Sequence, residues 1–193
     1  MGHWGWSLEK YWYYKNYKKS ILNFDTNNWK SIFHLRFLFA KKCKDKNIHL
    51  AIDTSACNFL TNKQDYIDLL NLVDLWIVDV KSLNEQEHKS ITGSNQLTGK
   101  LFIELLEKYK KPYWLRQVVI KSINDNDDHI NQLANFIKPL KYCQKYELLS
   151  YHNLAYDKYE KLGIPYPFKD IKMLTSDEFN ELKSKLDSLI KSN

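Results

Sequence analysis

Glycine is scarce in this chain and is missing from most of its first half. Only five of the 193 residues are glycine, and none lies between Gly5 and Gly93. Glycine is the residue that lets a backbone approach a ligand closely. A glycine-rich cofactor-binding loop is therefore excluded from the stretch between these two residues.

Cysteine is equally sparse. The three cysteines, Cys43, Cys57 and Cys143, lie far apart, and no CxxC or CxxxCxxC spacing occurs. An odd, scattered set argues against a disulfide framework. It also leaves the sequence without a local motif for a metal ion or an iron–sulfur cluster. We interpret the three cysteines as reduced structural thiols.

Long apolar runs are missing as well. No run approaches the roughly 18 residues of a membrane span, and the N-terminus lacks an apolar segment followed by a small-residue cleavage site. Apolar residues at 44% and charged residues at 27% are typical of one globular domain. We expect a protein with no membrane contact, located in the cytoplasm.

Positive charge is concentrated near the N-terminus. Residues 1–48 contain ten basic and three acidic residues, whereas the remainder contains 19 basic and 20 acidic residues. A basic stretch with interleaved aromatics is one footprint of a nucleic-acid binder, which is therefore an alternative function. We expect no nucleic-acid partner, because the excess lies where the pattern is least like an ordered element. Ser7 is a candidate N-cap for a helix in this stretch.

From about residue 39 the pattern becomes regular and predicts an α/β fold. Strands are predicted at 48–53, 75–80, 113–120 and 146–150. Helices are predicted at 31–46, 65–72, 97–110 and 128–138, with a further helical turn from Asn84 and a last helix opened by Thr175-Ser176-Asp177-Glu178. Alternating strands and helices imply a parallel sheet with right-handed crossovers.

Four strands are too few to close a barrel. We therefore expect a partial parallel (βα) barrel, truncated at its N-terminal half, over residues 39–193. Residues 1–38 form an atypical aromatic and basic segment. An open sheet of this kind leaves the strand at 48–53 as an exposed edge, which the N-terminal segment could cover.

Polar residues follow successive predicted strands at the same end. They are Asp53 and Thr54 after the first strand, Asp79 and Lys81 after the second, Arg116 within the third, and His152 after the fourth. The carboxyl ends of parallel strands share one edge, where α/β proteins bind ligands. Each residue alone has a structural explanation, such as a cap or a solvated charge. Their common phase favours a ligand site, although the strand pattern does not fix which way Arg116 faces.

Five segments carry a family resemblance. They are Ile48-His49-Leu50-Ala51-Ile52-Asp53-Thr54-Ser55, Asp74-Leu75-Trp76-Ile77-Val78-Asp79-Val80-Lys81, Glu87-His88-Lys89 with Thr92-Gly93-Ser94-Asn95, Tyr113-Trp114-Leu115-Arg116-Gln117-Val118-Val119, and Glu147-Leu148-Leu149-Ser150-Tyr151-His152-Asn153-Leu154. In order and spacing they resemble the glycyl-radical-enzyme activating enzymes of the radical SAM family, especially those of the pyruvate formate-lyase type. The resemblance covers about residues 38–187.

The resemblance implies a chemistry. The family has a partial parallel barrel, a [4Fe–4S] cluster and S-adenosylmethionine, and it draws electrons from a flavodoxin-type reductant. Reductive cleavage of S-adenosylmethionine gives a radical that abstracts hydrogen from a glycine of the partner, a glycyl radical enzyme such as a pyruvate formate-lyase.

The resemblance also assigns residues by position. The implied cofactor-binding set is Asp79, Val80, Lys81, Arg116 and His152, and the implied monovalent-cation ligands are Asp53, Thr54 and Asp79. Carboxylate and hydroxyl oxygens suit a hard cation. No catalytic residue is assigned.

The chain departs from the family in three places. The cluster motif CxxxCxxC is absent, and the stretch from Trp29 to Phe37 stands where the glycine-rich GGE loop is expected. Ile120-Lys121-Ser122 replaces the Val-Pro-Gly that follows the third strand. We hypothesise that this chain is the C-terminal portion of an activating-enzyme gene product, and that residues 29–38 are translated out of frame. We expect cluster binding by this chain to fail and the chain to be inactive alone. The alternative is a non-catalytic interaction module that binds the partner enzyme.

Overall fold

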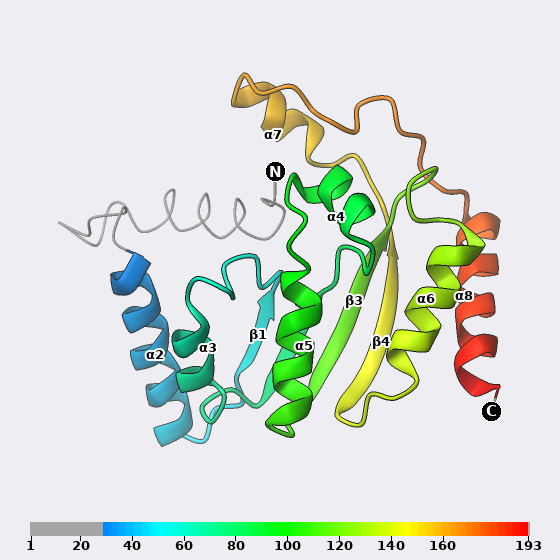
Figure 1. Cartoon of the computed structure of the whole chain (residues 1–193). Coiled ribbons are helices and arrows are strands. Elements are labelled where there is room, and N and C mark those ends of the chain that lie inside the picture. The colour runs from blue at the N-terminus through cyan, green and yellow to red at the C-terminus, as the bar shows by residue number, and fades with distance from the viewer. Residues whose placement is uncertain (1–28, 193) are drawn as a thin grey trace.

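The computed structural model describes residues 29–192 as a parallel sheet flanked by helices (Figure 1). The strands are β1 (Ala51–Thr54), β2 (Leu75–Asp79), β3 (Tyr113–Val119) and β4 (Cys143–Ser150), and they lie side by side in chain order. The helices are α2 (Trp29–Asp45), α3 (Lys63–Leu69), α4 (Glu85–Thr92), α5 (Thr98–Lys108), α6 (Asp127–Ile137), α7 (Tyr156–Lys161) and α8 (Ser176–Lys191). All three strand pairs are parallel, which confirms the predicted α/β class.

The predicted elements are present with shifted ends. β1 begins at residue 51 rather than 48, and β4 begins at residue 143 rather than 146. The expected division at residue 38 falls inside α2, which continues from Trp29 to Asp45. Helix α7 was not predicted, because its six residues are too few to display a helical period. The helix expected at Ser7 and the covering role of the N-terminal segment lie outside the described residues.

Helix caps account for several of these boundaries. The side chain of Asn84 accepts hydrogen bonds from the N–H groups of the second and third residues of α4, and that of Asn126 accepts one from the third residue of α6, His129. Thr175 and Glu178 form the predicted capping box at the start of α8. These side chains satisfy N–H groups that have no partner inside a helix.

No helix within residues 29–192 is both long and apolar enough to cross a membrane.

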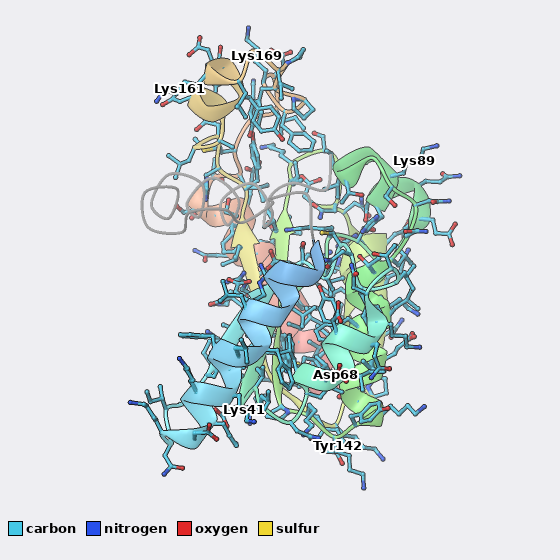
Figure 2. The ribbon with its side chains drawn as sticks, turned by 90° about the vertical axis from the view of Figure 1, so that its left-hand side faces the viewer. Lys41, Asp68, Lys89, Tyr142, Lys161 and Lys169 are labelled. Carbon is cyan, nitrogen blue, oxygen red and sulfur yellow. The ribbon has the colours of Figure 1, made fainter. Side chains whose placement is uncertain are left out.

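Alternate residues of the sheet point to a helix-covered face. Helices α3, α4 and α5 lie on one side of the sheet (Figure 2). Trp76 of β2 is 1% exposed and packs against Phe102 of α5 and Tyr66 of α3, with ring centroids 5.0 and 6.2 Å away. Burying a large side chain of this kind contributes roughly 1.5 to 3 kcal/mol to folding. This apolar cluster holds β2 in place.

Gly99 determines how closely α5 approaches the end of β2. A Cβ atom at Gly99 would lie 2.8 Å from the carbonyl oxygen of Asp79. This separation is shorter than carbon and oxygen atoms tolerate without displacement of the backbone. A glycine in the first turn of α5 therefore allows the helix to abut the backbone at Asp79.

A group of three buried or half-buried polar side chains lies between α4 and α6. The carboxylate of Glu87 accepts a hydrogen bond from the hydroxyl of Ser82, and its Oε2 atom lies 2.8 Å from Nδ1 of His129. Ser82 and His129 are 1% and 4% exposed. We call these three residues the interhelix network. It joins the segment after β2 to the helix after β3.

Candidate functional site at the carboxyl edge of the sheet

Three charged residues of neighbouring strands lie on the face of the sheet opposite Trp76. Asp79 of β2 is in register with Arg116 of β3, and Asp53 of β1 is in register with Ile77. Residues two apart on a strand point to the same face. Asp53, Asp79 and Arg116 therefore share one face, which settles the direction of Arg116 that the sequence left open.

The side chain of Arg116 joins both carboxylates. Its Nη2 atom lies 2.6 and 2.7 Å from the two oxygens of Asp53, and 2.9 Å from Oδ1 of Asp79. Its Nε atom donates to the same Asp79 oxygen at 3.0 Å. Lys81 Nζ donates to the other Asp79 oxygen, also at 3.0 Å. We call Asp53, Asp79, Lys81 and Arg116 the carboxyl-edge network.

The network is formally neutral and partly buried. Side-chain exposure is 13% for Lys81, 16% for Asp79 and 22% for Arg116, against 54% for Asp53. Burial alone would lower the pKa of Arg116, but the charge of Asp79 and the hydrogen bonds and charge of Asp53 outweigh it. The pKa of Arg116 is therefore raised above its usual value. Arg116 is a permanent cation at this edge.

The remaining predicted site residues are placed differently. Val80 is 1% exposed, its side chain belongs to the core, and its N–H donates to the carbonyl of Arg116 at 2.8 Å. Thr54 follows Asp53 on β1, so its side chain points to the other face, where its hydroxyl accepts a hydrogen bond from the N–H of Ala56. His152 is exposed beyond the end of β4 and is not part of the carboxyl-edge network. The structure thus brings four of the predicted residues together.

Sequence reasoning missed a neighbouring polar group on the same face. Glu147 of β4 is in register with Arg116 and pairs with Lys145, whose Nζ lies 3.0 Å away. That ammonium also lies 4.7 Å from the centroid of the Trp114 ring. The spacing of two between Lys145 and Glu147, matched by Trp114 and Arg116, was the signal that could have found this group.

The cysteines do not supply a cluster site. Cys43 is buried near the end of α2, Cys57 lies in the loop after β1, and Cys143 begins β4. A cluster ligand is a thiolate, but burial raises the pKa of Cys143 to about 11. Within residues 29–192, no group of three or more His, Cys, Asp or Glu side chains is arranged to hold a metal ion. The residues that the structure describes do not fit a [4Fe–4S] cluster.

Comparisons with solved structures define the class. A domain of pyruvate-formate lyase-activating enzyme from Bacteroides vulgatus ATCC 8482 superposes with a TM-score of 0.65 at 18% identity, covering 81% of this chain and 86% of that one. A radical SAM methyltransferase from Sphaerobacter thermophilus superposes with a TM-score of 0.53 at 15% identity, covering 75% and 40%. At these identities the likeness shows the fold alone, which is a parallel four-stranded α/β sheet consistent with the predicted partial barrel.

Comparisons of sequence narrow the class to a family. The chain is 34% identical over 143 residues to the pyruvate formate-lyase-activating enzyme of Streptococcus mutans, and 33% identical over 150 residues to that of Clostridium pasteurianum. These alignments cover 72% and 78% of this chain but 54% and 61% of the relatives, so the chain spans somewhat more than half their length. No protein-family model matches the chain.

The chain belongs to the family of glycyl-radical-enzyme activating enzymes, as a relative of the pyruvate formate-lyase-activating enzymes.

Proposed function

We propose that the carboxyl edge of this chain binds S-adenosylmethionine, and that the same side of the molecule binds a glycyl radical enzyme of the pyruvate formate-lyase type. Support comes from the relatives, which are named for activation of pyruvate formate-lyase, together with the carboxyl-edge network. Activation of the glycyl radical enzyme, the reaction that this binding serves, takes place in the cytoplasm and uses a flavodoxin-type protein as the reductant.

Lys81 is the residue best suited to hold the cofactor. Its side chain is 13% exposed and its ammonium is held by Asp79, so the ammonium can offer its remaining N–H donors to a carboxylate without losing its orientation. His152, exposed beyond β4, offers a ring nitrogen for a second polar contact. S-adenosylmethionine, when bound and reductively cleaved, supplies the radical that abstracts hydrogen from the partner's glycine.

The chain's own part is binding rather than radical generation. Its described residues do not fit the cluster that delivers the electron, so we assign no electron-transfer step to them. Two activities remain for this chain by itself, namely cofactor binding and docking of the partner. We therefore propose that the chain alone does not activate its partner.

Anaerobic reconstitution with iron and sulfide tests the cluster proposal. We expect the full chain to develop no charge-transfer absorbance of a bound cluster and to retain no stoichiometric iron after desalting. Stoichiometric iron with cluster absorbance would contradict the proposal. The matched control is the intact relative from Streptococcus mutans, prepared in parallel.

Retention of pyruvate formate-lyase on the immobilised chain tests the docking proposal. We expect saturable binding that survives physiological salt, because docking on a folded surface is not carried by net charge alone. Absence of binding at micromolar concentrations of both proteins would refute the docking part and leave cofactor binding to be measured separately.

A further inference from the structure

The guanidinium of Arg116 lies where two carboxylates of different strands converge. One nitrogen atom, Nη2, is within 2.9 Å of both Asp53 and Asp79. This is the geometry of a central cation shared by two anionic ligands. The cation here is part of the chain rather than a bound ion.

The oxygens around this position are already committed. Oδ1 of Asp79 accepts a hydrogen bond from Arg116, and Oδ2 accepts one from Lys81. Both carboxylate oxygens of Asp53 accept hydrogen bonds from Arg116. The hydroxyl of Thr54 accepts the N–H of Ala56 on the other face of β1. A hard monovalent ion needs several oxygen ligands at one point, and the predicted set does not provide them while Arg116 is in place.

Electrostatics point the same way. A second positive charge between Asp53 and Asp79 would lie beside both Arg116 and Lys81, whose side chains are only 22% and 13% exposed. Repulsion between like charges is screened weakly at such depth. A monovalent metal ion and the Arg116 guanidinium are therefore mutually exclusive at this position.

We propose that Arg116 is the resident cation of the carboxyl edge and that this chain takes no monovalent metal ion there. Of the cation set predicted from the resemblance, Asp53, Thr54 and Asp79, the two carboxylates become available only when Arg116 is removed, whereas Thr54 stays on the other face of β1. The inference concerns ion binding by the chain's own residues and does not depend on the proposed function.

Thermal unfolding in potassium chloride and in choline chloride of equal ionic strength tests the proposal, with the full chain and no other ligand. We expect the wild-type midpoint to be the same in both salts. In Arg116→Met the midpoint should fall in choline and rise saturably with potassium. With potassium at ten times its dissociation constant, the folding equilibrium constant should increase about elevenfold.

Arg36→Met is the matched control, because Arg36 is the chain's other arginine and is exposed on α2. Its midpoint should be insensitive to the choice of salt, as in the wild type. A saturable, potassium-specific rise in the wild type would overturn the proposal. So would an Arg116→Met protein that folds and shows no response to potassium. Should Arg116→Met fail to fold, titration of the wild type with thallium(I) followed by thallium NMR decides: no bound signal is expected, and a saturable one would overturn the proposal.

Discussion

Two polar networks lie on opposite sides of the same sheet and differ in what surrounds them. The interhelix network of Ser82, Glu87 and His129 is enclosed between α4 and α6, and the side chain of Glu87 is 15% exposed. The carboxyl-edge network lies on the face away from those helices, and one of its members, Asp53, is 54% exposed. Enclosed polar groups that are satisfied by one another stabilise a fold. Polar groups that reach solvent at strand ends are available to a ligand.

The largest effect should come from opening the enclosed network. Glu87→Ala removes one acceptor of Ser82 and the partner of His129, whose Nε2 atom is already buried without a hydrogen-bond partner among the described residues. Ser82 keeps the carbonyl of Asn84 as an acceptor, but the buried Nδ1 of His129 loses the Glu87 carboxylate. Together these losses should lower the free energy of unfolding by about 3 kcal/mol. Urea denaturation measures this, with Glu85→Ala, on the exposed first turn of the same helix, as the control. Equal costs for the two variants would refute the structural role of Glu87.

The next effect should come from the contact that connects the core to the edge. Gly99→Ala places a methyl group against the carbonyl of Asp79 and should destabilise the protein by about 2 kcal/mol. Gly163→Ala is a useful contrast, because Gly163 has a φ of +65° and open space around its Cβ position. It should cost about 1 kcal/mol through backbone strain alone. Only Gly99→Ala should also weaken ligand binding at the carboxyl edge, and a cost no larger than that of Gly163→Ala would contradict the close approach.

Within the carboxyl-edge network the two aspartates should differ. Asp79 contacts both bases and is 16% exposed, so Asp79→Asn should cost about 1.5 kcal/mol. Among residues 29–192 the Asp53 carboxylate pairs with Arg116 alone, and it is 54% exposed, so Asp53→Asn should cost about 0.5 kcal/mol. A double-mutant cycle with Arg116→Met gives each coupling energy. If Asp53→Asn costs the more, our ranking by burial is wrong.

The smallest effect concerns pH. Burial alone would raise the pKa of Glu87, but hydrogen bonds from His129 and Ser82 outweigh it, so the pKa lies below its ordinary value of 4.5. A carboxyl group with a lowered pKa in the folded state stabilises the protein above its unfolded pKa, and this stability is lost as pH falls through the folded pKa. Glu87→Gln should therefore flatten the fall in stability on acidification. An unchanged acid profile would show that Glu87 carries no such linkage.

The sequence predicted the order of elements because periodicity and caps are local signals. The strand ending at Asp79 and the capping box at Thr175 illustrate this, since each is encoded within a few residues. The link from Asp53 to Arg116 spans 63 residues and depends on register, which no local pattern contains. The interhelix network was missed for the same reason: Glu87 and His129 are 42 residues apart.

The family resemblance predicted which residues belong to the site, and the structure added the direction of each side chain. Val80 and Lys81 are neighbours in the same motif, yet the side chain of Val80 lies in the core and that of Lys81 meets Asp79. The alternation of a strand explains the difference. The position of a residue in a motif therefore indicated that it lies at the carboxyl edge of the sheet, whereas the direction of its side chain could be determined only from the structure.

Calorimetric titration of the full chain with S-adenosylmethionine tests the central claim, that the carboxyl edge is a cofactor site. We expect saturable binding by the wild type and at least a tenfold loss in Lys81→Met, about 1.4 kcal/mol, because a charge-assisted hydrogen bond is removed. Lys89→Met, on the outward side of α4 (Figure 2), should bind as the wild type does. No saturable binding by the wild type, or the same affinity in Lys81→Met as in Lys89→Met, would contradict the claim.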